Sequence, residues 1–302
     1  MSWSTIPVSH DGTTHPPSSG DSFPVRLVAI DIDGTLLDTA GRVPDANRQA
    51  IHAAVTRGVE VVLATGRSFH HARPIADRVG AKVVLIVSNG ALVKTADGVT
   101  LDQCSLPRHL VRDLIIDTRN VRQGAALIFD RADATQYMWE RIDWSHPQRQ
   151  WYYDRNRQYM TRTDALETAL DEEPIQLAFT GGVDEMRQLH ANIRALPSAR
   201  DLTLTLTEYE QRDFSLLDIT ASGCSKGSSV AAWASRRGIP TASVMAVGDN
   251  LNDLEMLKRA GYPVVMGNAV PELKRFGWPV TGPHDEAGLA QAIESQVLVT
   301  SG

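Results

Sequence analysis

The stretch DIDGT at residues 31–35 decides how this chain folds, because it places two carboxylates two positions apart directly after an apolar run. That run, RLVAI at residues 26–30, has the unbroken apolar pattern of a strand buried in a parallel sheet. Open α/β sheets bind ligands at the carboxyl ends of their strands, and Gly34 allows the chain to turn sharply there. The arrangement suits a magnesium-assisted phosphoryl transfer, although two acids before a glycine also occur in calcium loops and ordinary turns.

Three later stretches combine an apolar run or helix with a polar turn in the same way. The run at residues 59–64 leads into TGR at 65–67 and a helix expected from Ser68, and helix amino ends attract phosphate. The run at 243–247 leads into GDNLND at 248–253, so acids again follow a strand. SGCSKG at 222–227 puts a lysine at the start of a helix with an apolar pattern, although a lone lysine is usually a solvated surface charge.

In this order the motifs resemble those of the haloacid dehalogenase superfamily, and most closely its Cof-type branch. The matching motifs are DxDGT, TGR, SNGA at 88–91, a lysine followed by a glycine at 226–227, GDxxND, and MGNA at 266–269. The likeness covers roughly residues 25 to 290. It implies a phosphohydrolase that forms an aspartyl-phosphate. It also implies an α/β fold with a Rossmann-like, doubly wound, mainly parallel sheet and an inserted α+β cap.

The resemblance also implies a role for each motif residue. Asp31 would be the nucleophile, Asp33 the general acid and base, and Thr65 and Lys226 would complete the catalytic set. The residues implied in binding phosphate or substrate are Gly34, Gly66, Arg67, Asn89, Asn250 and Asn252. The ligands implied for a Mg²⁺ cofactor are Asp31, the backbone carbonyl of Asp33, Asp249 and Asp253. Asp253 keeps two open roles, as a direct ligand or as a residue that orients the metal's waters or Lys226.

Three segments are expected along the chain. Residues 1–24 are rich in Ser, Thr, Pro, Gly and His, lack the pattern of a secretory signal, and are expected to be a disordered tail. Residues 25–105 and 222–302 would form the catalytic core, in which strands and helices alternate. Residues 106–221 would form the inserted cap, with its helices on one face of its sheet, and would set substrate specificity. Pro279 predicts that the last core strand is displaced or shortened, because proline cannot donate to a strand ladder.

Aromatic and arginine side chains crowd residues 137–159, although aromatic residues make up only 6% of the chain. Interleaved aromatic and arginine residues can bind nucleic acid. Packing of the aromatic rings inside the cap, with the arginines solvated, is the simpler interpretation. His146 and Arg155 could reach a substrate, but no family motif supports either residue.

Composition limits the class of protein. A chain of 302 residues with 42% hydrophobic residues can bury a large core and is expected to form two domains. Its formal net charge of −6 argues against nucleic acid as a partner, and no apolar stretch approaches the ~20 residues that span a bilayer. Cys104 and Cys224 lie far apart in the sequence and outside the paired spacing of metal or redox motifs, which fits a reducing compartment. We expect a cytoplasmic monomer or homodimer with no nucleic-acid or membrane partner.

The function expected from the motifs is Mg²⁺-dependent hydrolysis of a phosphomonoester, on a small phosphorylated metabolite and most simply a sugar phosphate. The second acid, Asp33, favours hydrolysis of phosphate over release of halide, because superfamily members that release halide lack it. A phosphomutase or a non-catalytic phosphate-sensing protein are the alternatives. The identity of the alcohol depends on the cap, which carries no family motif.

Overall fold

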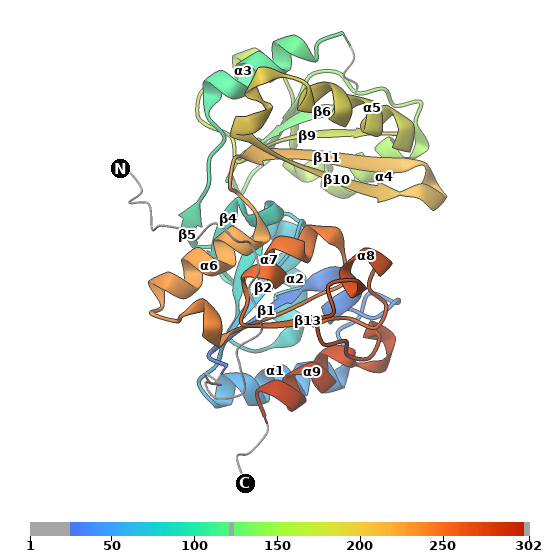
Figure 1. The fold of residues 1–302 in the computed structure, drawn as a ribbon. Helices are drawn as coiled ribbons and strands as arrows, with labels where there is room; N and C mark the ends of the chain where they lie inside the picture. Colours follow the sequence, from blue (N-terminus) through green and yellow to red (C-terminus); the bar gives the residue numbers. More distant parts are fainter. Residues whose placement is uncertain (1–24, 121–123, 299–302) are drawn as a thin grey trace.

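Two β-sheets organise the residues that the computed structural model describes, 25–120 and 124–298 (Figure 1). One sheet contains seven strands and the other contains six. The tail at residues 1–24, which we expect to be disordered, lies outside the described residues. No helix in the two described ranges is both long and apolar enough to cross a bilayer.

The seven-stranded sheet is mainly parallel, as its unbroken apolar runs predict. Its order is β13-β12-β1-β2-β3-β4-β5, and β4 alone runs against the other strands. The strands are β1 (Leu27–Asp31), β2 (Glu60–Ala64), β3 (Val84–Val87), β4 (Leu92–Thr95), β5 (Thr100–Gln103), β12 (Val244–Gly248) and β13 (Tyr262–Val265). Because β1 pairs with β12 and β2 in parallel, the polar turns after these three strands meet at one edge of the sheet.

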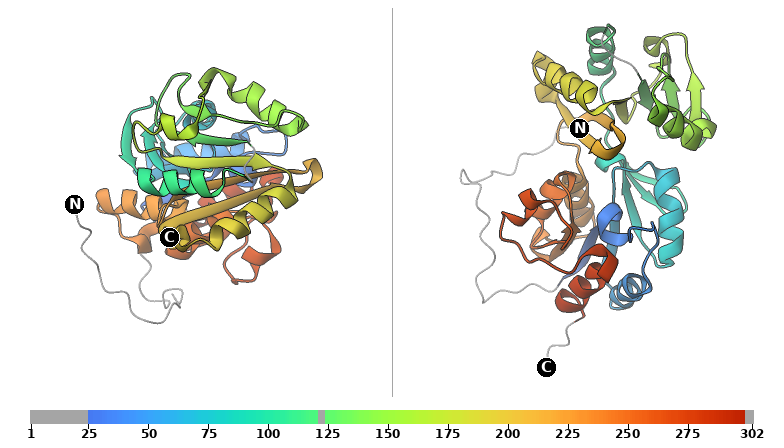
Figure 2. Two further views of the ribbon diagram at one scale, coloured as in Figure 1. Left: turned by 90° about the horizontal axis from the view of Figure 1, so that it is seen from above. Right: turned by 90° about the vertical axis from the view of Figure 1, so that its right-hand side faces the viewer.

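Helices cover both faces of this sheet, which makes it doubly wound. The helices are α1 (Asp45–Thr56), α2 (Phe69–Val79), α6 (Lys226–Arg236), α7 (Leu254–Arg259), α8 (Pro271–Lys274) and α9 (Gly288–Gln296). Helices α1, α2 and α9 lie on one face, and α6 and α7 pack together on the other (Figure 2). Gly227 near the start of α6 permits close packing on α7, because a Cβ there would lie 2.6 Å from the backbone of Glu255.

The six-stranded sheet has the order β10-β11-β9-β6-β7-β8 and is antiparallel except between β7 and β8. Its strands are β6 (Ala125–Ile128), β7 (Tyr137–Trp139), β8 (Met160–Arg162), β9 (Gln176–Gly181), β10 (Leu202–Tyr209) and β11 (Phe214–Ala221). The helices beside it are α3 (Arg108–Asp117), α4 (Pro147–Asn156) and α5 (Val183–Arg194). The chain therefore has a Rossmann-like core with an α+β cap, as predicted.

Strand alternation gives the cap sheet two different faces. Leu127, Leu177 and Leu217 point to an apolar cluster with α3 and α5. Gln176 and Asp218 point the other way, toward the core, where they line a cleft. The prediction of helices on one face holds for α3 and α5. It is wrong for α4, which lies near the core and covers part of the opposite face (Figure 1).

The edge of the core sheet after β13 is irregular, as Pro279 predicts. Val280 makes one isolated bridge with Val265, and no strand forms there among the described residues. The carbonyl of Pro279 still accepts a hydrogen bond from the amide of Val265 at 2.9 Å. A proline at this position therefore shortens the strand without detaching the chain.

Gly90 allows the turn after β3 to pack against the start of α6. Its φ is +101°, and a Cβ there would lie 2.2 Å from the carbonyl oxygen of Ser225. Gly90→Ala is therefore expected to lower the free energy of unfolding by about 2–5 kcal/mol, the sum of left-handed strain and overpacking. Chemical denaturation would measure this loss.

Gly58→Ala is the matched control for that substitution. Gly58 also has a left-handed φ, +80°, but no atom lies within 4 Å of an added Cβ. Gly58→Ala should lower the free energy of unfolding only through left-handed strain, by about 1–2 kcal/mol. Equal losses in the two variants would contradict the packing argument at Gly90.

Candidate active site

Lys226 links the end of β1 to the loop after β12. It is the first residue of α6, which begins there because the side chain of Ser225 caps the helix by accepting from the Ser228 amide. Its Nζ donates to Oδ1 of Asp31 at 2.6 Å and to Oδ1 of Asp253 at 2.8 Å. All three charged side chains are buried. Lys226 is thus held between two carboxylates and is not the solvated surface charge that a lone lysine usually is.

The cluster has one ammonium group, on Lys226, beside the two carboxyl groups of Asp31 and Asp253, so it has too little positive charge to balance both carboxylates. Burial opposes the charge of Lys226, but the carboxylates of Asp253 and Asp31 outweigh burial and raise its pKa. Burial raises the pKa of Asp31 well above its ordinary value, and Asp253 adds to this effect while Lys226 opposes it. A further cation would stabilise the ionised form of Asp31.

The carboxylates are placed so that they could hold such a cation. Asp31, Asp249 and Asp253 each offer an oxygen, and these atoms lie within 4.8 Å of one another. Oδ1 of Asp249 is buried and has no hydrogen-bond partner among the described residues. Carboxylate oxygens are the ligands that hard divalent cations prefer. The residues present therefore fit a divalent metal ion.

The side chain of Asp253 is already engaged on both of its oxygens. Oδ1 accepts from Lys226, while Oδ2 accepts from the backbone amides of Asp249 and Asn250 at 3.1 Å each. These bonds fix the loop after β12 and the ammonium group together. Of its two open roles, this geometry favours orienting Lys226 over direct metal ligation.

Two further residues shape the acidic cluster. Gly34 has a left-handed φ of +81°, and a Cβ there would lie 2.3 Å from Oδ2 of Asp249. Asn268 donates from Nδ2 to the carbonyl of Gly34 at 2.8 Å and so holds this turn beside Asp249. Sequence reasoning quoted the MGNA motif but gave Asn268 no role. The motif itself was the signal that could have found it.

The second acid of the opening motif pairs with the turn after β2. Both carboxylate oxygens of Asp33 accept from Arg67, at 2.6 and 2.7 Å. Thr65, at the end of β2, is buried, and its Oγ1 accepts from the Arg67 amide at 3.1 Å. Gly66 is needed for close packing, because a Cβ there would lie 2.9 Å from Oδ1 of Asn89. The TGR motif therefore lies beside the opening motif, and its arginine holds Asp33.

Asn89 connects the core to the cap. It adopts a left-handed φ of +55° after β3, and its Nδ2 donates to Oδ2 of Asp218 on β11 at 3.1 Å. The backbone amide of Asn89 also donates to the carbonyl of Thr65 at 3.1 Å. The asparagine predicted to bind substrate thus connects the turn after β2 to the cap sheet.

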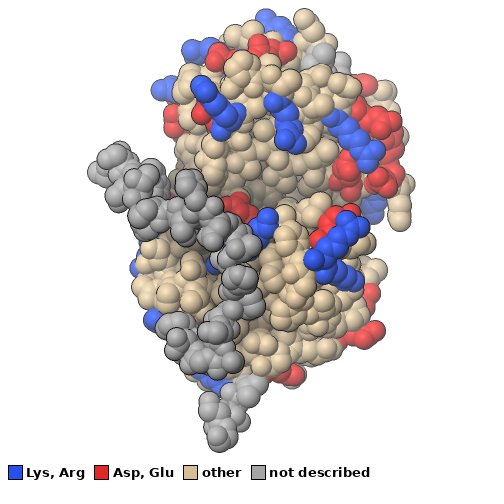
Figure 3. Space-filling model, viewed as in Figure 1, with Lys and Arg blue, Asp and Glu red and all other residues tan. Residues whose placement is uncertain are grey.

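One cleft of about 450 Å³ collects most of the predicted residues, and a hollow between the two sheets is visible in Figure 3. This volume is typical of a site for a small metabolite. The predicted residues that line it are Asp31, Asp33, Thr65, Gly66, Arg67, Asn89, Lys226, Asp249, Asn250 and Asn252. Gly34 and Asp253 lie directly behind this lining, in contact with Asp249 and Lys226.

The cap contributes residues to the cleft that sequence reasoning missed. Asp218 is buried and accepts from Gln176 Nε2 as well as from Asn89. Burial raises the pKa of Asp218 to about 7, against the effect of these two donors. The signal was an acid within the apolar run FSLLDITA. Arg155 lines the cleft, whereas His146 lies outside its lining and contacts the carbonyl of Asp213.

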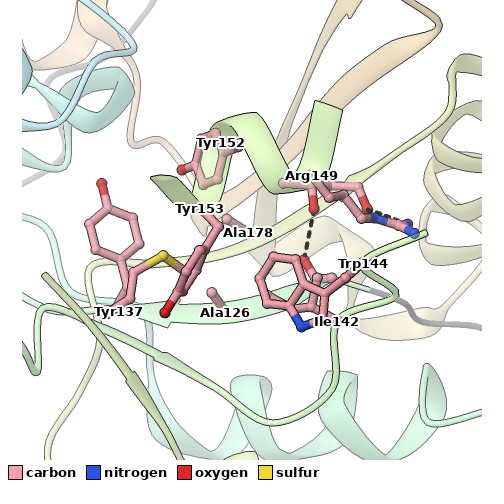
Figure 4. Close-up of a pocket in the computed structure, with 11 residues that line it drawn as sticks. Ala126, Tyr137, Ile142, Trp144, Arg149, Tyr152, Tyr153 and Ala178 are labelled. Carbon is pink, nitrogen blue, oxygen red and sulfur yellow. Dashed lines mark hydrogen bonds between the residues drawn. The ribbon is translucent and has the colours of Figure 1, made fainter. Parts of the chain in front are cut away.

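Four of the crowded aromatic side chains pack around a small cavity beside the cap sheet. Tyr152 and Tyr153 of α4, with Tyr137 and Trp144, surround a cavity of about 20 Å³ on the strands of Ala126 and Ala178 (Figure 4). That volume has room for about one water molecule and none for a metabolite. The packing interpretation therefore accounts for these rings.

Arg149 corrects one part of that interpretation, because it is not solvated. It is buried, donates to the carbonyl of Thr180 at 2.7 Å and pairs with Glu185 at 2.9 Å. The carbonyl and the carboxylate together satisfy a guanidinium that would otherwise be costly to bury.

Comparisons with known proteins bear on both the fold and the site. Residues 28–293 match the family model described as haloacid dehalogenase-like hydrolase. The 5-amino-6-(5-phospho-D-ribitylamino)uracil phosphatase YcsE of Bacillus subtilis is 29% identical over 91% of this chain and 96% of its own. The HMP-PP phosphatase of Serratia proteamaculans is 30% identical over 82% of this chain and 86% of its own. The solved structure of the phosphatase BT1666 from Bacteroides thetaiotaomicron has a TM-score of 0.76 at 23% identity, covers 93% of this chain and 100% of that one, and supports the fold.

The charge state of Asp249 predicts that a divalent cation binds more tightly as the pH rises. Burial and the neighbouring Asp253 raise the pKa of Asp249 to about 7. Without a cation, its contribution to stability is present at low pH and is lost as the pH rises through about 7. A cation binds the ionised form, so the increase in melting temperature on adding MgCl₂ should be larger at about pH 8 than at about pH 6.

Asp218 also has a pKa of about 7, so its titration changes the melting temperature over the same pH range as that of Asp249. The difference between melting temperatures with and without the cation isolates the effect of Asp249, because Asp218 is not in the acidic cluster. Asp249→Asn should remove most of the cation-dependent increase at both pH values. Asp184→Asn, which changes a fully exposed carboxylate, should behave like the natural sequence. An increase of equal size at both pH values would show that Asp249 does not titrate in this range.

Proposed function

The chain belongs to the haloacid dehalogenase-like hydrolases, and from that premise we propose that this phosphatase hydrolyses phosphomonoesters in a Mg²⁺-dependent reaction through an aspartyl-phosphate on Asp31. The observation that carries the proposal is the 2.6 Å contact between Asp31 and the buried ammonium of Lys226 inside the cleft. A carboxylate held beside a fixed cation is suited to approach a phosphate dianion, since the cation offsets the repulsion between the two anions.

Asp31 has one oxygen available for the attack. Lys226 occupies Oδ1, and no described residue donates a hydrogen bond to Oδ2. Oδ2 would attack phosphorus while the bond from phosphorus to the alcohol oxygen breaks, which leaves the phosphoryl group on Asp31. Asp33 would give its proton to the departing alkoxide.

Asp33 would then act as a base in the second half of the reaction. It would take a proton from a water molecule that attacks phosphorus. The bond between phosphorus and Asp31 breaks, and inorganic phosphate and a free carboxylate result. Arg67 now holds both oxygens of Asp33, so we propose that the guanidinium moves onto the phosphoryl oxygens when the substrate binds.

The acidic cluster would hold the metal ion. Asp31 and Asp249, with the backbone carbonyl of Asp33, would be its ligands, and bound Mg²⁺ would supply positive charge beside the reacting phosphate. Asp253 would keep Lys226 and the loop in place. Thr65 and the amides after it would hold the phosphoryl oxygens.

We propose that the core and the cap divide the work. Residues 25–105 and 222–302 would carry the chemistry, and residues 106–221 would close over the phosphate and select the alcohol. Two curated relatives are named for phosphorylated metabolites, a phospho-ribitylamino-uracil and HMP-PP, which supports a small phosphorylated metabolite as the substrate. Sugar phosphates and ring-bearing phosphates both fit a cleft with aromatic and polar walls.

Release of inorganic phosphate from a panel of sugar, nucleotide and cofactor phosphates tests this proposal. Asp31→Asn should abolish release, because an amide oxygen is a poor nucleophile. Lys226→Met should lower kcat by about 10²–10³-fold, the cost of one preorganised charge. A chelator should stop the natural enzyme.

The variant Asp33→Asn separates the two half-reactions. With p-nitrophenyl phosphate, whose leaving group departs without a proton, it should slow turnover and let phosphorylated protein accumulate, since no base then activates the water. Asp184→Asn controls for the loss of a carboxylate at an exposed site. Phosphate release that persists in Asp31→Asn or in the presence of chelator would overturn the mechanism.

A further inference from the structure

Two arginines from separate elements converge on one aromatic side chain at the cleft. Trp151 on α4 lines the cleft and is 44% exposed. The guanidinium carbon of Arg155, one turn later on α4, lies 4.8 Å from the Trp151 ring centroid. That of Arg212, in the short helical turn η6 (Glu210–Arg212) between β10 and β11, lies 5.9 Å away. Arginine stacked on an exposed indole keeps its donors free for a ligand.

Neither arginine has an anionic partner among the described residues. The other cations that line the cleft do, since Arg67 pairs with Asp33 and Lys226 pairs with Asp31. Glu208 also lines the cleft, but it is engaged by Arg187 at 2.6 Å. The cap wall thus carries two uncompensated positive charges, and a guanidinium fork matches a carboxylate or a phosphate.

An aromatic wall, formed by Tyr209 and Phe214 of the cap, lines the same cleft as these arginines and Asp31. Tyr209 at the end of β10 stacks on Phe214, with ring centroids 6.3 Å apart, and remains exposed to the cleft. Burial raises the pKa of its hydroxyl, and the charges of Asp33, Arg67 and Arg212 also act on it. A ligand that lies along this wall would therefore reach from the phosphoryl site toward the arginines.

We propose that Trp151, Arg155 and Arg212 form a subsite for a second anionic group of the substrate, a carboxylate or a phosphate. This inference rests on the proposed function, because it places the scissile phosphate at Asp31. The substrate class is then a phosphorylated metabolite with an anionic group at each end. Because the core holds one end and the cap holds the other, such a substrate also draws the cap onto the core.

The test measures binding to the Asp31→Asn protein by calorimetry, so that no turnover is needed. The probes are short alkanediols of increasing length in three forms: the monophosphate, the bisphosphate and the analogue with a terminal carboxylate. At the best length, a two-anion probe should bind at least about tenfold more tightly than the monophosphate, the contribution of one charge-assisted hydrogen bond. The bisphosphate and carboxylate arms identify which anion the subsite prefers.

Substitution of the arginines assigns the effect. In the same background, Arg155→Gln and Arg212→Gln should each weaken two-anion probes by about tenfold and leave the monophosphate unchanged. Arg200→Gln is the control, because its side chain is also in the cap, is 84% exposed and lies outside the cleft. This variant should bind all probes as before, which excludes a general effect of net charge.

Two results would overturn the subsite. One is equal affinity for monophosphate and two-anion probes at every length. The other is an equal loss for all probes in the arginine variants, which would mean that Arg155 and Arg212 only support the fold. Turnover by the natural enzyme is measured separately, so its failure would count against the proposed function and leave the binding comparison valid.

Discussion

The buried ammonium group of Lys226 is the interaction on which the site depends. It joins the end of β1, through Asp31, to the loop after β12, through Asp253. Removing one partner from a buried ion pair costs about 3–5 kcal/mol, because the remaining charge has no solvent to stabilise it. Asp253 extends this link to the backbone amides of Asp249 and Asn250. The cluster therefore positions Asp31, Lys226 and the loop that carries Asp249 through one set of bonds, and the folding of the core preorganises it.

The cap depends on the core in a different way, through strand alternation. One face of its sheet packs on α3 and α5, so the other face, with Asp218 and Gln176, is turned toward the reacting groups. A register shift of one residue would exchange these faces and remove the polar wall from the cleft. The hydrogen bond between Asn89 and Asp218 joins the turn after β3 to the cap sheet. Side chains of the core and of the cap therefore meet in one cleft.

Sequence alone predicts the core better than the cap, for physical reasons. The core strands are continuous apolar runs, and in a parallel sheet the residues after them must meet at one edge, which brings Asp31, Thr65 and Asp249 together. No such rule says which face of an antiparallel strand meets another domain, so Asp218 and Tyr209 escaped notice. Burial also depends on distant partners, which is why Arg149 was expected to be solvated and is not. The sequence could not decide between metal ligation and the orienting role for Asp253, because both roles place an aspartate at this position. Only the side-chain geometry distinguishes them.

Trapping the phosphorylated enzyme tests the central claim most directly. The enzyme is mixed with substrate and Mg²⁺, quenched with acid during turnover, reduced with borohydride and digested, and its peptides are examined by mass spectrometry. An acyl phosphate is reduced under these conditions, whereas a free carboxylate is not. The account predicts that Asp31 alone is converted, and only when substrate is present. Conversion at another acid, or none at all in the Asp33→Asn variant, in which the phosphorylated protein should accumulate, would contradict it.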